Sequence, residues 1–351
     1  MKLPNSLRLF LNREAQKLMP LVGSALRFRW TRPVRAFIRK HLTPQSRAIQ
    51  IAVTYKCQSR CKHCGVGKYR QKGRKELTTG ELKSLLDQMR EMDFGVAYFF
   101  GGDPLIREDL EDLIKYAHDL GMYTRLDTNG LALTKEKVAS LKAAGLDRIG
   151  VSLDSADPAV HDKNRGVKGI FEKAWNGLKE AKAAGIYTYI STYACHETLD
   201  DGSLADLVEM GRQNGVRSRI LSPIMAGRWQ QLDMRLDSGE EEKLLDLLGP
   251  DRGYWENDDC VHGRHQFICA ATIGKNNYVS AYGDVQPCCY IPFSFGNIRK
   301  EPLKVIMKRM WAHPMLRDFA YVSGCPMNEE EFRRRYIDRL VPGENLPKEL
   351  Y

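Results

Sequence analysis

The sequence predicts an α/β fold, a partial TIM-like barrel of six β/α repeats. Short runs rich in β-branched and aromatic residues alternate with longer stretches of helical periodicity through residues 48–221. Such an alternation is typical of parallel strands joined by right-handed helical crossovers. In complete barrels of this kind the chemistry lies at the C-terminal ends of the strands, so we expect functional residues there.

The order of the elements follows from these runs. Strands are predicted at 48–54, 95–100, 123–126, 148–153, 187–193 and 216–221. Helices are predicted between them at 81–92, 108–120, 135–144, 171–184 and 203–214. On the fifth strand, tyrosines alternate with Thr188, Ile190 and Thr192. A period of two does not tell which of the two sets faces the inside of the barrel.

The chain divides into four segments. Residues 1–47 form a basic N-terminal extension, and 48–230 form the barrel. Residues 231–255 are expected to be a linker that contains a polar stretch, and 256–351 a second domain with its own group of cysteines. A chain of 351 residues is long enough to bury the core of such an assembly.

The positive charge of the chain is concentrated at its N-terminus. Residues 1–47 contain eleven Lys or Arg and a single acid, Glu14, so this segment alone carries the formal net charge of +10. Apolar residues such as Leu7, Leu11 and Leu18 can share one face of a helix there. A basic amphipathic segment is typical of a helix that lies on an anionic membrane surface. A solvated arm packed on the barrel is the alternative.

The composition also indicates a location. No uncharged run of about 18 residues is present, so we expect no membrane span, and no secretory signal is recognisable. Nine cysteines without such a signal point to a reducing cytosol, where thiols bind metal or stay free. We therefore expect a cytoplasmic protein, peripheral at the inner face of the membrane. Nucleic acid is not expected as a partner, because residues beyond 47 show no basic stripe.

Three cysteines directly after the first strand predict an iron–sulfur site. Cys57, Cys61 and Cys64 have the spacing Cys-x3-Cys-x2-Cys. A four-iron cluster normally takes four thiolates, so three leave one iron open to an exogenous ligand. A zinc site is the alternative, but zinc loops usually bring a second Cys/His pair nearby, and His63 lies between two of the cysteines.

The cysteine motif resembles that of the radical S-adenosylmethionine (SAM) superfamily. The resemblance implies that the amino and carboxylate groups of SAM chelate the open iron of a 4Fe-4S cluster. It also implies an enzyme in which one electron, from a donor such as flavodoxin or ferredoxin, cleaves SAM reductively. The resulting 5'-deoxyadenosyl radical would abstract hydrogen from an unactivated C–H bond of the substrate.

Motifs at later strand ends extend the resemblance. Gly101 to Pro104 resembles the family's Gly-Gly-Glu-Pro with Asp in place of Glu, and Arg165-Gly166 resembles the Arg-Gly that reaches the SAM carboxylate. Thr-Asn-Gly after the third strand and Ser-Leu-Asp after the fourth also match. The resemblance therefore assigns SAM binding to Gly101, Gly102, Asp103, Pro104, Asp127, Thr128, Asn129, Ser152 and Arg165.

A second cysteine group resembles the SPASM and Twitch cluster-binding extensions. Cys269 and Cys288 fit Cys-x13-Gly-x4-Cys, and Cys325 follows in Ser-Gly-Cys-Pro. The resemblance implies one auxiliary 4Fe-4S cluster with Cys260, Cys269, Cys288 and Cys325 as ligands. Cys289 is the alternative fourth ligand. Some members carry an acid at the position of Cys289 that serves as a base, so alcohol oxidation of the sulfatase-maturing kind is not expected.

Cys195 follows the fifth strand and is a candidate catalytic residue. The resemblance implies that such a thiol can donate a hydrogen atom to a substrate radical, whereas a lone cysteine on a barrel strand is more often a small buried hydrophobe.

The substrate is expected to be a peptide that is modified after translation. The alternative is a membrane lipid or lipid-linked small molecule delivered by the N-terminal segment. A non-enzymatic redox module is less compatible with the sequence, because such a module does not require SAM-binding motifs at the strand ends.

Overall fold

The computed structural model describes residues 47–351 except 223, 227–231, 234, 257, 262–263, 268, 321–323, 342–344 and 351. For 258–261 and 264–267 only the backbone is described. Residues 1–46 of the predicted basic extension 1–47 and the side chain of Cys260 therefore lie outside the described residues, whereas Arg47 begins the first strand. None of the described helices is long and apolar enough to span a bilayer.

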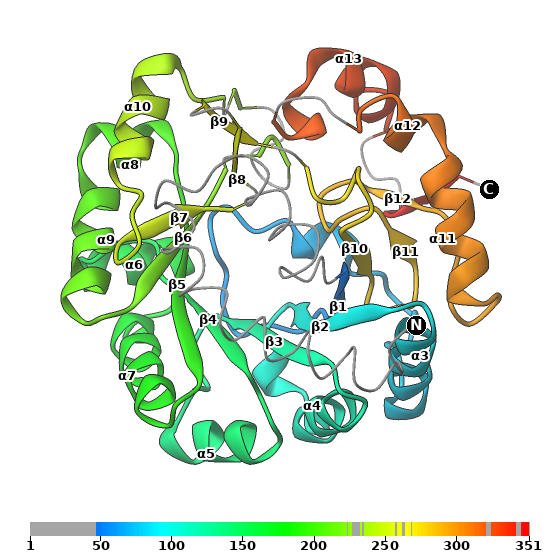
Figure 1. The fold of residues 1–351 in the computed structure, drawn as a ribbon, viewed down its shortest axis with the longest axis horizontal. Helices are drawn as coiled ribbons and strands as arrows, with labels where there is room; N and C mark the ends of the chain where they lie inside the picture. Colours follow the sequence, from blue (N-terminus) through cyan, green and yellow to red (C-terminus); the bar gives the residue numbers. More distant parts are fainter. Residues whose placement is uncertain are drawn as a thin grey trace, which may run out of the picture.

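A single sheet of nine strands forms the centre of the molecule, in the order β11-β10-β1-β2-β3-β4-β5-β6-β7 (Figure 1). Its strands are β1 (Arg47–Thr54), β2 (Phe94–Gly101), β3 (Tyr123–Thr128), β4 (Arg148–Ser152), β5 (Tyr187–Tyr193), β6 (Arg217–Leu221), β7 (Gly253–Trp255), β10 (Asn276–Val279) and β11 (Val285–Gln286). All neighbours pair in parallel except β10 and β11. The predicted partial barrel of six parallel strands is thus confirmed as β1 to β6.

Helices follow the strands and cover the outer face of the sheet (Figure 1). They are α3 (Thr79–Glu91), α4 (Leu110–Asp119), α5 (Lys135–Ala143), α6 (Pro158–Arg165), α7 (Ile170–Ala183), α8 (His196–Asp200) and α9 (Ser203–Gln213). Helix α3 shows why they form: Thr78 and Glu81 make a capping box at its start, and its apolar positions are buried on one face. The buried apolar side chains of α3, α4, α5 and α7 and of the outward strand positions form one core, and side chains of α8, α9 and β6 form a second, smaller cluster.

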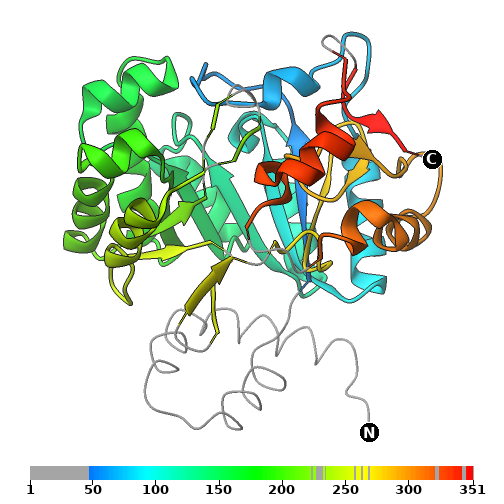
Figure 2. The same cartoon turned by 90° about the horizontal axis from the view of Figure 1, so that it is seen from above.

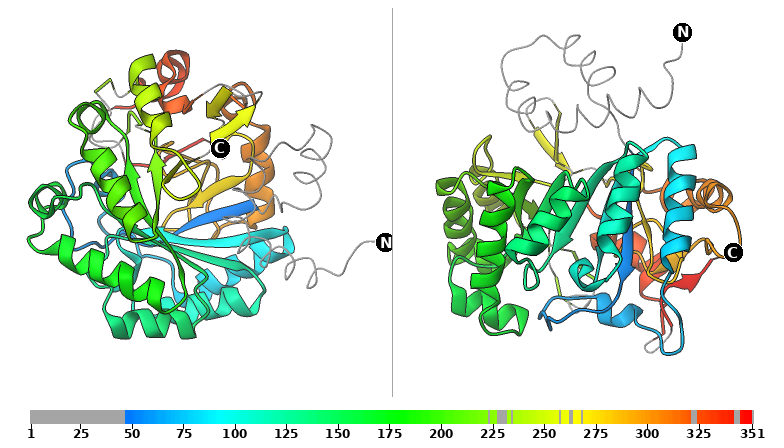
Figure 3. Two further views of the ribbon diagram at one scale, coloured as in Figure 1. Left: turned by 60° about the vertical axis from the view of Figure 1, so that its left-hand side comes forward. Right: turned by 90° about the horizontal axis from the view of Figure 1, so that it is seen from below.

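The sheet is wider than the sequence predicts. Within 231–255, which the sequence indicates as a connection, the chain forms α10 (Ser238–Asp246) and β7, and β7 pairs parallel with β6. On the other side, β10 pairs parallel with β1, so the C-terminal part of the chain continues the barrel sheet (Figure 3). These strands have only three or four residues each, too few for a periodic pattern to identify them.

The C-terminal residues pack against the β1 side of the sheet, opposite α8 and α9 (Figure 2). Their helices are α11 (Leu303–Ala312), α12 (Pro314–Arg317) and α13 (Glu330–Phe332), and β12 (Phe293–Ser294) pairs with β13 (Lys348–Glu349). The hairpin of β8 (Asp258–Val261) and β9 (Arg264–Phe267) follows β7 and lies apart from these helices (Figure 2). The described residues also form the 3₁₀ helices η2 (Val66–Tyr69), η3 (Pro104–Ile106) and η5 (Pro326–Asn328) and the π-helix η6 (Arg333–Ile337). Arg299 joins the two parts, because its guanidinium lies 2.5 Å from Glu81 of α3.

Candidate active site

The cysteine loop begins where β1 ends, at the C-terminal edge of the sheet. Helix α6 holds it from one side: the amides of Arg60 and Lys62 donate to the carbonyls of Arg165 and Asn164, both at 2.9 Å. Glu76 holds its entry, because its carboxylate accepts from the Tyr55 amide at 2.7 Å. The backbone of the loop is therefore held by hydrogen bonds on both sides of its first cysteine.

Gly101 and Gly102 lie against this loop. The Gly102 amide donates to the Thr54 carbonyl at 2.7 Å, and the Asp103 amide donates to the Lys56 carbonyl at 2.9 Å. A Cβ atom on Gly102 would overlap the Lys56 carbonyl oxygen, and Gly101 has a φ of +141°, where a side chain is strained. The two glycines, expected to contact SAM, thus let β2 approach the start of the cysteine loop.

Two of the three thiols accept N–H groups. Asn129 Nδ2 lies 3.6 Å from the sulfur of Cys57, and Arg165 Nη1 lies 3.7 Å from that of Cys61. Burial raises the pKa of both thiols, so a bound metal is needed to hold them as thiolates. No three His, Cys, Asp or Glu side chains in the described part of the chain are arranged around one metal ion. A four-iron cluster holds its cysteines further apart than one ion does, and N–H donors to sulfur suit such a cluster.

Asp103 is buried beside the loop with one carboxylate oxygen unused. Its Oδ1 accepts from the Thr128 hydroxyl at 2.7 Å, whereas Oδ2 has no hydrogen-bond partner in the described residues. Burial raises the pKa of Asp103 to about 6. Pro104 starts the turn η3, which Asp103 caps. A buried acceptor without a partner suits a ligand that carries an ammonium group.

Arg165 and Asp154 form a buried ion pair at the end of β4. Arg165 Nη2 lies 2.6 Å from Asp154 Oδ1, and neither Arg165 Nε nor Asp154 Oδ2 has a described hydrogen-bond partner. Burial and the Arg165 charge lower the pKa of the neighbouring His161 to about 4, so this imidazole is neutral. Its Nδ1 accepts the Asp154 amide at 3.1 Å. The free atoms of the pair are suited to a zwitterionic ligand such as the amino-acid part of SAM.

Asp127 and Ser152 differ from the other expected SAM contacts. The Asp127 carboxylate accepts from the hydroxyls of Tyr98 and Tyr189 and from Arg219 Nη2, so it is fully engaged inside the barrel. Ser152 ends β4 and is half-buried. The structure therefore brings together the cysteine loop, Asp103, Thr128, Asn129 and Arg165, but directs the Asp127 side chain into the lumen.

The lumen holds charged residues that sequence reasoning missed. Arg125, Arg148 and Arg219 stack on the rings of Tyr98 and Tyr189, with the guanidinium carbons 4.1 to 5.3 Å from the ring centroids. The tyrosine set of β5 thus faces the lumen. Gly150 makes room for this network, since a Cβ atom there would overlap Asp127 and Tyr189. The sequence signals are Tyr123, Arg125 and Asp127 at alternate positions of one strand, and Tyr187 and Tyr189 at alternate positions of another.

Cys195 is buried at the start of α8, next to the end of β5. Its amide donates to Thr198 Oγ1 at 3.1 Å, and its sulfur lies 3.5 Å from the same oxygen. Tyr193, two residues earlier, packs on His63 of the cysteine loop with ring centroids 4.9 Å apart. Cys195 therefore lies at the same end of the sheet as the loop, and its catalytic role stays a prediction.

Three of the expected auxiliary-cluster ligands converge in the C-terminal part. Cys269 precedes β10, Cys288 follows β11 and Cys325 precedes η5. Burial and the Cys269 sulfur raise the pKa of Cys288 to about 12, and burial followed by the Cys269 and Cys288 sulfurs raises that of Cys325 well above its usual range. Three neighbouring thiols fit one cluster. Cys289 packs against Tyr55 and Tyr278, so it and Cys260 both stay candidates for the fourth ligand.

Comparison with known proteins supports both parts. Residues 51–210 match the model described as the radical SAM superfamily, and 269–333 match the SPASM iron–sulfur cluster-binding domain. The chain is 29% identical to the AdoMet-dependent heme synthase of Oleidesulfovibrio alaskensis, covering 73% of each chain. It is 26% identical to the PqqA peptide cyclase of Xanthomonas oryzae pv. oryzae, covering 82% of each. The fold resembles Streptococcus suis SuiB bound to precursor peptide SuiA, with a TM-score of 0.60, 15% identity, and 81% and 69% of the two chains covered.

Proposed function

Because the chain belongs to the radical SAM superfamily and carries a SPASM domain, we propose that it modifies a peptide by hydrogen abstraction from an unactivated C–H bond. The 4Fe-4S cluster and SAM, when bound, supply the 5'-deoxyadenosyl radical for this step. The chain's own residues hold the cysteine loop, position the amino-acid part of SAM and enclose the substrate. Electrons come from a flavodoxin- or ferredoxin-type donor.

The observation that carries the proposal is the set of unpaired polar atoms around the cysteine loop. Asp103 Oδ2, Asp154 Oδ2 and Arg165 Nε are buried without described hydrogen-bond partners. Buried polar groups normally have partners, so these atoms suit a ligand that brings an ammonium and a carboxylate. They lie beside three cysteines that share one loop. A zinc site or a redox module does not require buried polar atoms that bind an ammonium and a carboxylate.

The peptide class is supported by the similarity to a PqqA peptide cyclase over 82% of the chain. The heme synthases are relatives of comparable identity, so a porphyrin is a competing outcome of the test. The decisive experiment compares a deletion strain with its parent by peptide, porphyrin and lipid profiling. We expect a modified peptide that is lost in the deletion strain, restored by the wild-type gene and not restored by a Cys57→Ala, Cys61→Ala, Cys64→Ala variant. An unchanged peptide profile contradicts the peptide proposal.

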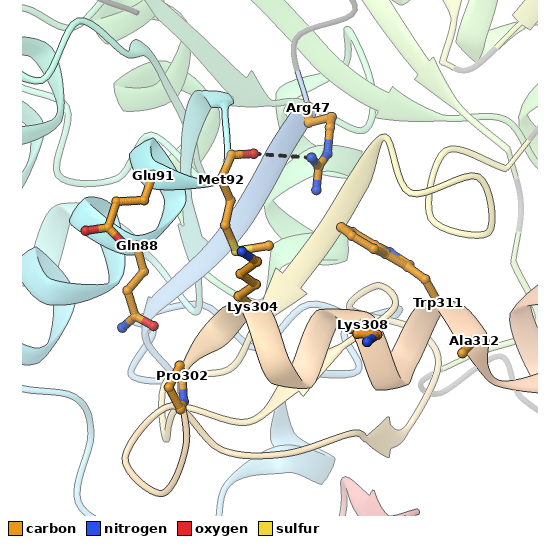
Figure 4. A pocket seen from close by; sticks show the side chains of 9 residues that line it. All are labelled: Arg47, Gln88, Glu91, Met92, Pro302, Lys304, Lys308, Trp311 and Ala312. Carbon is orange, nitrogen blue, oxygen red and sulfur yellow. Dashed lines mark hydrogen bonds between the residues drawn. The ribbon is translucent and has the colours of Figure 1, made fainter.

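A second candidate substrate is a membrane lipid or lipid-linked molecule, and a cleft at the end of β1 opposite the cysteine loop is suited to docking the protein on a membrane. The cleft has a volume of about 750 Å³ and lies between α3 and α11 (Figure 4). Its lining includes Arg47, Lys304 and Lys308, with Glu91 as the acid. The Arg47 guanidinium lies 4.7 Å from the Trp311 ring. Basic and aromatic side chains together suit a headgroup region, and the basic segment 1–46 directly precedes Arg47.

A further inference from the structure

The barrel lumen contains more positive than negative side chains. Arg125, Arg148 and Arg219 on β3, β4 and β6 share it with two carboxylates, Asp127 and Glu256. Asp127 is paired with Arg219. Glu256 Oε1 lies 3.3 Å from Arg219 Nη1 and 3.6 Å from Arg125 Nη2. Both carboxylates are thus paired with Arg219 and Arg125, two of these three arginines.

Arg148 has no carboxylate within ion-pair distance among the described residues. Its Nη2 donates to the Tyr254 hydroxyl, and its Nε has no described hydrogen-bond partner. Its guanidinium carbon lies 5.1 Å from the Tyr187 ring centroid and 4.3 Å from that of Tyr189. Aromatic faces attract a cation, but they do not neutralise it.

A partly buried cation without a counter-charge costs free energy unless an anion joins it. Arg125 is the β-register partner of Arg148, so two guanidinium groups lie on neighbouring strands. Solvent reaches this part of the lumen, because Arg125 and Glu256 keep 16% and 26% of their side-chain surface exposed. Guanidinium forks bind carboxylate and phosphate in the same bidentate way.

We propose that Arg148, with Arg125 beside it, binds an anionic group of the substrate, a carboxylate or a phosphate, inside the barrel. This inference rests on the proposed function, because it assigns the lumen to the substrate. Arg148 begins β4 and Ser152 ends it at the SAM side. Four residues of strand correspond to about 13 Å, so the anionic group is held roughly that far below the strand end where hydrogen is abstracted.

The test measures binding of small anions to full-length protein with reconstituted clusters. Ligand-observed NMR titrations use glutarate, inorganic phosphate and the neutral glutaramide. Wild type should bind glutarate or phosphate but not glutaramide, and Arg148→Gln should weaken anion binding at least about tenfold, the scale of one charge-assisted contact. Tighter binding of phosphate indicates a phosphate-bearing substrate, and tighter binding of glutarate a carboxylate-bearing one.

The controls separate binding from folding. Arg212→Gln removes an exposed arginine of α9 and should bind the anions as wild type does. Arg148→Lys keeps the charge but loses the fork, so its affinity should fall between wild type and Arg148→Gln; it also serves if the glutamine variant does not fold by circular dichroism. No binding of either anion to wild type, or equal binding to folded Arg148→Gln, overturns the proposal. Wild-type 5'-deoxyadenosine formation, measured separately, tests the proposed function.

Discussion

Arg165 lies 2.6 Å from Asp154 Oδ1 through one terminal nitrogen and 3.7 Å from the Cys61 sulfur through the other. The backbone of the same residue accepts the Arg60 amide of the cysteine loop. One residue thus links α6, the end of β4 and a cluster ligand. Burial opposes the charge of Asp154, but Arg165 outweighs it and holds the pKa of this carboxyl below its ordinary value.

Arg165→Ala is expected to weaken SAM binding. The loss of a charge-assisted contact to the SAM carboxylate should cost on the order of 1.5–3 kcal/mol. Isothermal titration with SAM under anaerobic conditions measures this. An affinity equal to that of wild type contradicts the assignment of Arg165 to SAM.

The same variant leaves the Asp154 carboxylate unpaired, so it is also expected to lose stability at neutral pH. The double variant Arg165→Met, Asp154→Asn removes both charges and should regain most of that stability, because replacing a whole buried pair costs far less than breaking it. It should not regain SAM affinity. Thermal unfolding and SAM titration of the three proteins separate the two effects.

Gly102→Ala is expected to displace the start of the cysteine loop. The new methyl group would overlap the Lys56 carbonyl, which lies in backbone and cannot move aside. We expect destabilisation by roughly 1–3 kcal/mol, as for overpacking, and reduced iron at the first cluster. Gly80→Ala in α3 is the control: it meets nothing within 4 Å and should be neutral or slightly stabilising. Equal thermal unfolding of both variants would contradict this account.

Asp103 should make stability depend on pH. Its pKa is raised by burial to about 6 from 3.8, so the folded state holds this proton over a range where the unfolded state has lost it. The free energy of unfolding of wild type, relative to that of Asp103→Asn, should therefore fall by on the order of 3 kcal/mol as pH rises from about 4 to about 6. Above that range the difference should stay constant. Denaturant unfolding of both proteins from pH 4 to 7.5 measures the difference. A difference that does not change with pH shows that Asp103 titrates normally.

The sequence predicts the parts of this molecule that are encoded locally. Strands β1 to β6 follow from runs of β-branched residues, and the cysteine loop follows from its spacing alone. The lumen network could not be predicted, because alternation on β5 does not reveal which face Tyr189 occupies. That Asp127 pairs with Arg219 depends on contacts between residues 92 positions apart. The contact of Gly102 with Lys56 is hidden for the same reason: a Gly-Gly pair does not show what approaches it.

The iron content should report two clusters. Protein reconstituted anaerobically is expected to hold about eight irons, four per cluster. The Cys57→Ala, Cys61→Ala, Cys64→Ala variant should retain about half and form no 5'-deoxyadenosine. Cys269→Ala with Cys288→Ala should lose the other half, because these two sulfurs lie with Cys325 in one neighbourhood. Wild-type iron near four per chain, unchanged by the second pair of substitutions, contradicts the auxiliary cluster.

The basic extension and the cleft that Arg47 lines should bind an anionic membrane. Full-length protein is expected to co-sediment with phosphatidylglycerol vesicles, to be released by salt as the screening length shortens, and not to sediment with phosphatidylcholine vesicles. Deletion of residues 1–40 should abolish sedimentation and leave uncoupled SAM cleavage intact, because no expected ligand lies in that stretch.

Lys304→Glu with Lys308→Glu, which changes two lysines of the cleft, should weaken vesicle binding, since each basic residue near such a surface contributes about 1 kcal/mol. The matched control, Lys173→Glu with Lys179→Glu on α7, makes the same change in net charge at exposed positions of another helix and should bind as wild type does. If the truncated protein still sediments, or full-length protein never does, the extension does not bind membranes, and the lipid candidate loses its support.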